Sequence, residues 1–440
     1  MSKNVFAGSG VSKNDDPFKA GKEAVELALK NMRKQGGKKP NFGFVFCSGG
    51  KYGKGGKDIK KLVEGAHNAF MNANKDCKWI GCTTTGELSS YGYSTKSCVA
   101  MAVETEYIHV GTGVGERINE NPKRGTVKAF EESTKDLKID KYLDPYMQFL
   151  AMKRKTPGEL IKYSPFHIIT LIQGPLKKPG REDEVVSVLK SIVGNKIPIT
   201  GGSSADDFNF IASYQFCNGK IYTDSVIMMT LISHLKLGTG TKSGFKLSDK
   251  SFIVTDCHGR VIHKLDGKPA AQVLAKAYGS TVKKLSEWVT PGFQRCFFLN
   301  DTSPILIAEG PGLHRVAVFH MIQGNDVIIG SGVVNNTAIT LGRMTKEDMI
   351  NAAPASINEV KKEVGGDLAA LICFDCCMRQ QALKEDIKKE NKVIMKAVGK
   401  TPIVGFYTYG EQGFMKGAST NHMNYTVTCL GISDRLMSNK

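Results

Sequence analysis

Apolar and polar positions follow the same order in three places along the chain. An apolar run of strand length comes first, at residues 42–47, 167–172 and 368–374. A pattern with apolar residues at three- and four-residue steps follows each run and predicts an amphipathic helix. It is clearest in the first copy, at Ile59, Leu62, Val63, Ala66 and Phe70. A second apolar run then ends in a glycine, which predicts a strand–helix–strand unit that occurs three times.

Each second apolar run leads into a short polar segment that we call a hydroxyl turn. The three hydroxyl turns are GCTTTGE at residues 81–87, GGSSADD at 201–207 and GFYTYGE at 405–411. In each, hydroxyl groups follow a glycine and a carboxylate closes the segment, so we interpret Glu87, Asp206 and Glu411 as equivalent. Small residues let a ligand approach the backbone, while hydroxyls and an acid offer donors and acceptors. A further strand is expected after each turn, at residues 98–103, 225–231 and 425–432.

The remaining segments complete a two-domain α/β prediction. Asp16 and Pro17 favour a helix start, with the helix running through residues 20–29. Residues 140–165 interrupt the pattern, with a short helix possible at 146–153, and residues 231–249 are interpreted as a domain junction. Beyond it we expect a hairpin at 252–265, a helix near Leu274 and strands at 306–308, 317–319 and 327–329. The predicted domains are 1–240 and 241–440, each a mixed β-sheet flanked by helices and built from strand–helix–strand units.

Composition narrows the function classes. The 440 residues carry a formal net charge of +18, but lysine outnumbers arginine and no basic stretch interleaves aromatics, which argues against nucleic-acid binding. No apolar stretch reaches the ~18 residues of a membrane span, so a soluble, cytoplasmic protein is expected. The eleven cysteines mostly lie within apolar runs and are expected to be reduced and buried. Residues 48–57 follow a strand as a phosphate loop would, but match neither GxxxxGK[ST] nor GxGxxG.

The hydroxyl turns, the FDCCMR segment at 374–379 and Asn421 ahead of Thr426 together resemble the FIST family, whose name stands for F-box and intracellular signal transduction proteins. The resemblance covers about 38–235 as a FIST N domain and about 250–430 as a FIST C domain. It implies an intracellular sensor of small molecules such as amino acids that acts without catalysis through a separate signalling partner such as a histidine kinase. One bacterial branch resembles haem-binding nitric-oxide sensors, which keeps haem as an alternative cofactor.

The resemblance is incomplete at two places. Asp375 and Cys377 are additional to the family pattern beside Cys376, and the spacing between Asn421 and Thr426 differs from it. The ligand-binding residues predicted from the turns and these segments are Thr83, Thr84, Glu87, Ser203, Ser204, Asp206, Cys376, Arg379, Tyr407, Thr408, Glu411 and Asn421. They are expected at the carboxyl ends of strands, facing a cleft.

Several individual roles stay open at this stage. Arg379 either binds a ligand carboxylate or forms a salt bridge to Glu411, and Glu87 either holds an ammonium group or caps a loop. We expect the third turn to matter most, because Arg379 gives it a charged partner. Cys373 and Cys376 have redox-motif spacing, and Cys376 or Ser203 is the nucleophile of an alternative hydrolase or transferase. Spacing alone selects no haem ligand among the histidines His67, His109, His234, His258, His263, His314, His320 and His422.

Overall fold

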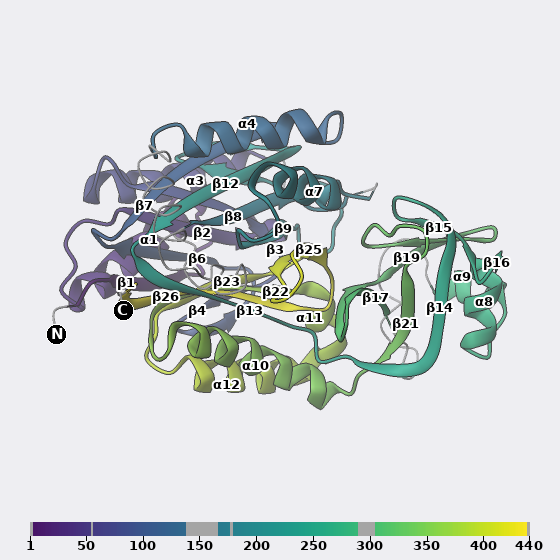
Figure 1. The fold of residues 1–440 in the computed structure, drawn as a ribbon. Helices are drawn as coiled ribbons and strands as arrows, with labels where there is room; N and C mark the ends of the chain where they lie inside the picture. Colours follow the sequence, from purple (N-terminus) through teal and green to yellow (C-terminus); the bar gives the residue numbers. More distant parts are fainter. Residues whose placement is uncertain (1–2, 54–55, 138–165, 177–178, 289–303, 438–440) are drawn as a thin grey trace.

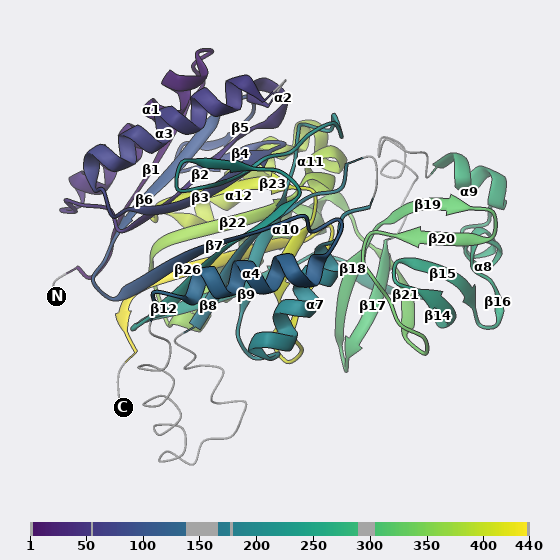
Figure 2. The ribbon, with the colours of Figure 1, turned by 90° about the horizontal axis from the view of Figure 1, so that it is seen from above.

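The computed structural model describes residues 3–53, 56–137, 166–176, 179–288 and 304–437. Three six-stranded sheets surround a common apolar core, and a fourth sheet forms a separate body at one side of the molecule (Figures 1 and 2). The short helix predicted near 146–153 lies outside the described residues. Within the described part of the chain, no helix is long and apolar enough to cross a membrane.

Three units of the same element order build the core of the protein. Each unit runs strand, helix, strand, helix, strand and, after a hairpin, a last strand. The first unit contains β1 (Phe6–Ser12), α1 (Pro17–Lys34), β2 (Phe42–Ser48), α3 (Lys57–Ala73), β3 (Lys78–Thr84) and β6 (Cys98–Glu104). The second contains β7 (Ile108–Glu116), α4 (Pro122–Thr134), β8 (Phe166–Gln173), α7 (Glu182–Val193), β9 (Ile199–Ser204) and β12 (Ser225–Ser233). The third contains β13 (Leu235–Lys242), α10 (Lys346–Val364), β22 (Leu368–Cys376), α12 (Ile387–Val398), β23 (Ile403–Thr408) and β26 (Val427–Leu436).

The strand pairing is the same in all three units. The two strands of the predicted strand–helix–strand motif are parallel neighbours: β2 with β3, β8 with β9 and β22 with β23. The last strand of each unit (β6, β12 or β26) lies antiparallel beside the first strand of this parallel pair. The first strand of the unit (β1, β7 or β13) then pairs with the free edge of that last strand. The predicted repeat is therefore confirmed, and it is longer than the sequence pattern indicated because a strand and a helix precede each copy.

A hairpin follows each hydroxyl turn and pairs with the sheet of another unit. The hairpins are β4 and β5 (Glu87–Ser89 and Gly92–Ser94), β10 and β11 (Gln215–Cys217 and Lys220–Tyr222), and β24 and β25 (Glu411–Phe414 and Thr420–Met423). The first unit's hairpin pairs with β23, the second unit's with β3 and the third unit's with β9. The exchange is cyclic, so each of the three sheets is completed by a neighbour.

The core of the protein lies inside the ring of three sheets. Apolar side chains from all three inner faces form one cluster, in which the rings of Phe46 and Phe406 are 4.6 Å apart. The helices cover the outer faces, with α1 and α3 on the first sheet, α4 and α7 on the second, and α10 and α12 on the third (Figure 2). Asp16 caps α1 by accepting from Lys19 N, and Pro17 occupies its first turn, as predicted.

The described residues of 246–288 and 304–343, which we call the β body, lie between β13 and α10 in the chain. The body contains β14 (Lys246–His258), β15 (Val261–Leu265), β16 (Lys268–Pro269), α8 (Ala270–Ala277), α9 (Val282–Trp288), β17 (Ile305–Gly310), β18 (Leu313–Ala317), β19 (Phe319–Gln323), β20 (Asp326–Ile329) and β21 (Ala338–Arg343). Its sheet has β18 at one end and β19 at the other, although Val318 alone separates them in the chain. The sheet therefore curls around an apolar cluster of its own.

Two segments differ in detail from the sequence prediction. The stretch 231–249, interpreted as a junction, contains β13, which pairs with β26 along its length. Its alternating glycine and threonine residues pack against α10, where Gly240 lets the backbone approach Ser356 O. The expected strand at 317–319 is instead the point where β18 ends and β19 begins. The boundary between domains 1–240 and 241–440 falls within β13 and stays a prediction.

Candidate functional site

The three hydroxyl turns meet one another at the carboxyl ends of the parallel strands. Backbone hydrogen bonds join them in pairs: Ala205 N to Thr83 O at 2.8 Å, Ser203 N to Gly410 O at 2.8 Å and Tyr407 N to Gly86 O at 2.8 Å. Turn residues on the predicted ligand-binding list are buried. The turns therefore form a closed junction among the three units, and their side chains contact each other where a cleft was expected.

The closing position of the turn is occupied by Glu87, Gln215 and Glu411. Each of the three begins the hairpin that pairs with another unit. Glu87 is paired with Phe406, Gln215 with Cys82 and Glu411 with Gly202. Each of these partners directly follows the first glycine of its own hydroxyl turn. The interpretation that Asp206 is the second unit's equivalent is wrong. Residues 208–214 separate Gln215 from the turn, so the sequence phrase does not contain it.

These three side chains attach each hairpin to its own unit. Glu87 accepts hydrogen bonds from Thr84 Oγ1 at 2.6 Å and Ser97 Oγ at 2.6 Å. Gln215 donates to Ser204 Oγ and accepts from Ser225 Oγ at 2.7 Å, and Glu411 accepts from Thr426 Oγ1 at 2.7 Å. Burial, supplemented by Asp207, raises the pKa of Glu87 to about 8, and burial raises the pKa of Glu411 well above its usual range.

Asp206 has a different structural role. Its carboxylate accepts from the backbone N–H groups of residues 210, 211 and 212 and from Tyr409 Oη at 2.6 Å. These four donors organise the loop that leads from the hydroxyl turn to β10. The ring of Phe210 stacks on that of Tyr409 at 4.9 Å, which covers the hydrogen-bonded carboxylate.

Arg379 lies in α11 (Cys377–Leu383), in a completely buried ion-pair group. Its Nε donates to Asp375 Oδ1 at 2.7 Å, and its Nη2 donates to Glu390, whose other oxygen accepts from Tyr407 Oη at 2.9 Å. The alternative of a salt bridge to Glu411 is therefore wrong. The role of Arg379 in ligand binding stays a prediction, and its charge is balanced by protein carboxylates.

Cys376 is buried at the end of β22, beside Glu411 and Cys377. Burial raises the pKa of its thiol well above the usual value, so the thiol stays protonated at neutral pH. We expect the native protein to alkylate at Cys376 at least about 100-fold more slowly than at the partly exposed Cys257. Peptide mass mapping after iodoacetamide treatment at pH 8 measures the alkylation rates of Cys376 and Cys257. Unfolding the protein in urea should make the two rates equal. Equal rates in the folded protein would contradict the buried-thiol assignment.

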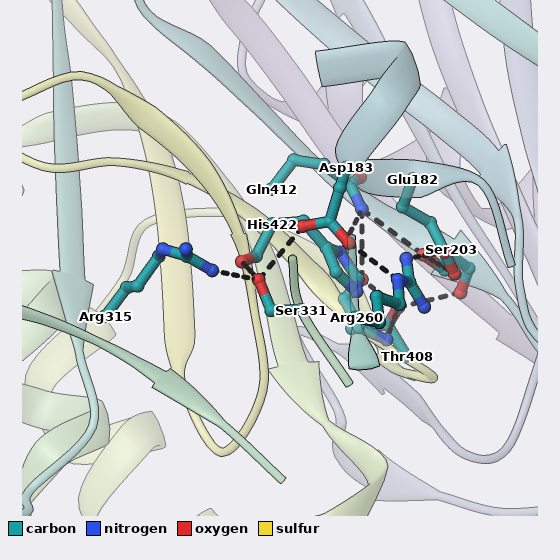
Figure 3. Close-up of polar contacts among 10 residues, drawn as sticks. Glu182, Asp183, Ser203, Arg260, Arg315, Ser331, Thr408, Gln412 and His422 are labelled. Atoms are coloured by element: carbon teal, nitrogen blue, oxygen red, sulfur yellow. Dashed lines mark hydrogen bonds and ion pairs between the residues drawn. The ribbon is translucent and has the colours of Figure 1, made fainter. Parts of the chain in front are cut away.

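A second group of charged side chains lies where the second unit faces the β body (Figure 3). Glu182 and Asp183 are in the first turn of α7, and Arg260 is in the turn between β14 and β15. Arg260 Nη2 donates to Glu182 Oε2 at 2.9 Å and its Nε to Asp183 Oδ2 at 2.7 Å. Although burial opposes it, the two carboxylates raise the pKa of Arg260, so this guanidinium is charged.

Neutral groups of the core complete the surroundings of Glu182. Ser203 Oγ donates to Glu182 Oε1 at 3.4 Å, and Gln412 Nε2 donates to Ser203 Oγ at 3.2 Å (Figure 3). Thr408 Oγ1 donates to Ser203 O at 2.7 Å, which connects the third turn to the same place. Two of the predicted ligand-binding residues, Ser203 and Thr408, are therefore brought together here.

A second guanidinium extends the charged group along the β body. Arg315, on β18, forms an ion pair with Glu309 and donates to Ser331 Oγ. The Ser331 hydroxyl lies 2.9 Å from Asp183 Oδ1, across the boundary between the β body and the core. Burial would raise the pKa of Asp183, but Arg260, His422 and Arg315 outweigh it and hold this pKa below the usual value.

The same row of contacts continues to Asn421 on β25, a third predicted residue. Asn421 Nδ2 donates to Glu309 Oε2 at 3.4 Å, and Lys190 Nζ donates to Asn421 Oδ1 at 3.4 Å. Burial lowers the pKa of Lys190. We call the six charged residues of this region the joint cluster: Glu182, Asp183, Lys190, Arg260, Glu309 and Arg315.

Sequence reasoning missed the six joint-cluster residues. One signal was available, because three acidic residues at 182–184 begin a predicted helix. Their partners Arg260 and Arg315 lie in the β body, and no local pattern connects them with α7. His422, included among the possible haem ligands, is beside the cluster and contacts Gln412 at 3.4 Å.

The surroundings of His422 bear on the haem alternative. Burial lowers its pKa, and Glu182, Asp183, Arg260 and Arg315 are close enough to affect its charge. A porphyrin needs apolar walls around its axial ligand, and charged side chains surround this imidazole. The residues near His422 therefore do not fit haem. Among the described residues, no group of three or more histidine, cysteine or acidic side chains is placed to hold a metal ion.

The fold and the site define an α/β protein of three repeated units with a β body attached through a buried, charged joint. Family models match residues 41–268 as a FIST N domain and residues 270–414 as a FIST C domain. The chain belongs to the FIST family, whose domains are sensor domains of signal transduction.

Individual relatives are distant. The chain is 23% identical over 247 residues to the uncharacterized protein MJ1623 of Methanocaldococcus jannaschii, a match covering 52% of this chain and 47% of the relative. The chain thus spans about half the length of this curated relative. Among solved structures, a cyanuric acid hydrolase is 8% identical with a TM-score of 0.28, covering 53% of this chain and 70% of the other. The cyanuric acid hydrolase from A. caulinodans is 8% identical with a TM-score of 0.35, covering 98% and 99%. Neither likeness carries an argument about function.

Proposed function

We propose that this protein is a non-catalytic sensor of a small, polar, amino-acid-like metabolite that binds at the joint cluster. The observation that carries the proposal is the charge pattern of that cluster. The core contributes two anionic side chains and one cationic side chain, the β body contributes two cationic and one anionic, and Glu182 and Arg315 are buried. A zwitterionic ligand carries both signs, so its ammonium and carboxylate groups can replace protein–protein ion pairs without leaving a buried charge unpaired.

Ligand sites occur preferentially where two bodies meet, and the position of this cluster suits a sensor. The β body is connected to the core by two chain crossings, after β13 and before α10. A ligand bound between α7 and the β body would change the contacts between the two parts and so favour one relative arrangement of them. The altered arrangement can then be recognised by a separate signalling partner, such as a histidine kinase.

Two observations support a non-catalytic role. The Ser203 hydroxyl contacts a glutamate and an amide, and no described imidazole is hydrogen-bonded to it as a general base. The thiol of Cys376 is buried and protonated. Neither side chain has the activated surroundings of a nucleophile, which disfavours the hydrolase or transferase alternative.

The test is a thermal-shift and calorimetric screen of amino acids, each beside analogues that lack either the amine or the carboxylate. We expect zwitterions to bind at least about tenfold more tightly than either analogue, because each lost charge leaves an unpaired partner. Arg315→Met should weaken binding of the best zwitterion by at least about tenfold.

Arg343→Met is the matched control, because Arg343 is in the same β body and forms an exposed ion pair with Asp249. Its affinity for the ligand should equal that of the unaltered protein. Ligand binding that Arg315→Met leaves unchanged would place the site elsewhere. Turnover of a bound compound that disappears in Ser203→Ala would overturn the non-catalytic assignment.

A further inference from the structure

The guanidinium of Arg260 is bound by two carboxylates that belong to a different part of the protein. Its guanidinium comes from the turn between two strands of the β body, and its two donated bonds go to two different carboxylates in the first turn of α7 (Figure 3). Gly259, at φ +57°, precedes it and allows the tight turn that presents the side chain. Its contacts with the core are therefore made by the tip of a hairpin.

The third unit contains the same arrangement with an arginine of its own. There a hydroxyl of the turn strand, Tyr407 Oη, donates to Glu390 in the first turn of α12, and Arg379 pairs with the same glutamate. In the second unit the corresponding hydroxyl is Ser203 and the corresponding glutamate is Glu182. The hydroxyl–glutamate–guanidinium group thus occurs in two of the three units.

The two copies differ in the source of the cation. Arg379 belongs to the third unit itself and is fully buried, with side-chain exposure of 0%. No arginine of the second unit pairs with Glu182 in the described structure, and Arg260 from the β body takes that place with 15% of its side chain exposed. The second unit therefore presents two carboxylates whose guanidinium partner belongs to another part of the protein.

We infer that the pocket formed by Glu182 and Asp183, with Ser203 and Gln412 behind it, is a binding site for the guanidinium group of a ligand, and that Arg260 is its tethered occupant. The inference rests on the proposed function and assigns a ligand class to the same site. A guanidinium suits the pocket better than an ammonium, because its rigid fork of N–H donors can reach two separate carboxylates at once.

The apparent affinity of a guanidinium ligand depends on its competition with the Arg260 side chain. A tethered group is present at an effective concentration in the millimolar range or above, so it lowers the apparent affinity for any free guanidinium. Ligand binding displaces Arg260 and removes two ion pairs between the β body and the core. Removing the Arg260 side chain leaves Glu182 and Asp183 without their ion-pair partner, and the vacated position should then accept a small guanidinium directly.

The experiment compares methylguanidinium chloride binding to the full chain and to Arg260→Ala by calorimetry and thermal melting. Tetramethylammonium chloride serves as the salt control, because it carries the charge without N–H donors. We expect Arg260→Ala to bind methylguanidinium at least tenfold more tightly than the unaltered protein, and Glu182→Gln in the Arg260→Ala background to abolish the gain. Arg343→Ala, which removes an exposed guanidinium from the same body, should show no gain.

Two measurements keep the inference falsifiable if Arg260→Ala folds poorly. Arg260→Lys retains a cation without the fork and should still bind methylguanidinium more tightly than the unaltered protein. In the unaltered protein, methylguanidinium should increase hydrogen exchange in the β14–β15 turn, whereas tetramethylammonium should not. Absence of methylguanidinium binding to a folded Arg260 variant, or binding that Glu182→Gln leaves intact, overturns the inference. Amino-acid binding that depends on Arg315 would survive that result, so the proposed function is tested separately.

Discussion

Replacing Arg379 with alanine is expected to lower the free energy of unfolding by about 3–5 kcal/mol, the largest loss of stability among the substitutions considered. The guanidinium, Asp375 and Glu390 all have side-chain exposures of 0%, so the variant leaves two carboxylates facing each other away from water. Burial raises the pKa of Asp375 and Arg379 opposes this rise, so loss of the guanidinium removes the interaction that favours the ionised carboxylate. Equilibrium urea unfolding at pH 7.5 measures the loss.

Arg343→Ala is the control for this experiment. The Arg343 ion pair with Asp249 is exposed on both sides, so its removal should change stability by less than about 0.5 kcal/mol. A loss below about 1 kcal/mol in Arg379→Ala would show that the two carboxylates accommodate the change by protonation or by water. Retained ligand affinity in the folded variant would assign Arg379 to stability alone.

Replacing Glu87 with glutamine is expected to stabilise the protein above neutral pH. The pKa of Glu87 is about 8 in the folded chain, chiefly through burial and secondarily through Asp207, against an ordinary value of 4.5. Between these two values the folded chain retains a proton that the unfolded chain releases, so stability falls as the pH rises through this window. At pH 8.5 the glutamine variant should be more stable by roughly 4 kcal/mol, and near pH 4.5 the difference should almost disappear.

The second unit shows that the position accepts an amide. Gln215 occupies the equivalent place, donating to Ser204 Oγ and accepting from Ser225 Oγ, and Thr84 and Ser97 offer the same two hydroxyls to Glu87. Urea unfolding across pH 4.5–8.5 measures the free energy of unfolding of both proteins. Glu26→Gln, which alters an exposed side chain, is the control and should leave the pH dependence of stability unchanged. A glutamine variant with the same pH dependence as the unaltered protein would assign the titration to another group.

Elements with a local pattern were predictable from the sequence. The strands β6 and β12 begin at the residues where their apolar runs begin, and α1 begins at the predicted proline, directly after the predicted cap. These elements are determined by neighbours within a few residues, through side-chain periodicity and capping. The hairpin exchange has no such local signal, because partners such as Thr85 and Tyr407 are 322 residues apart.

The candidate site was predictable only in part, for the same reason. Ser203, Thr408 and Asn421 belong to segments whose glycine and hydroxyl pattern indicated strand ends. Arg260 lies in a turn that reads as an ordinary hairpin, and its partner Glu182 reads as part of a helix start. An ion pair between separate bodies becomes visible only when the fold brings the two segments together.

The cyclic exchange of hairpins has a consequence for synthesis of the chain on the ribosome. The hairpin of β4 and β5 is made early, but its partner β23 is among the last strands to be made. Until then, β4 presents an unpaired edge, and the sheet containing β3 waits for β10. The strands of the first unit can pair with one another as they emerge, but the two edges that the hairpin exchange completes wait for strands made much later. Closure of the ring is therefore expected to be slow relative to the assembly of proteins with local contacts. Chaperone dependence during this interval is the expected cellular cost of the closed ring.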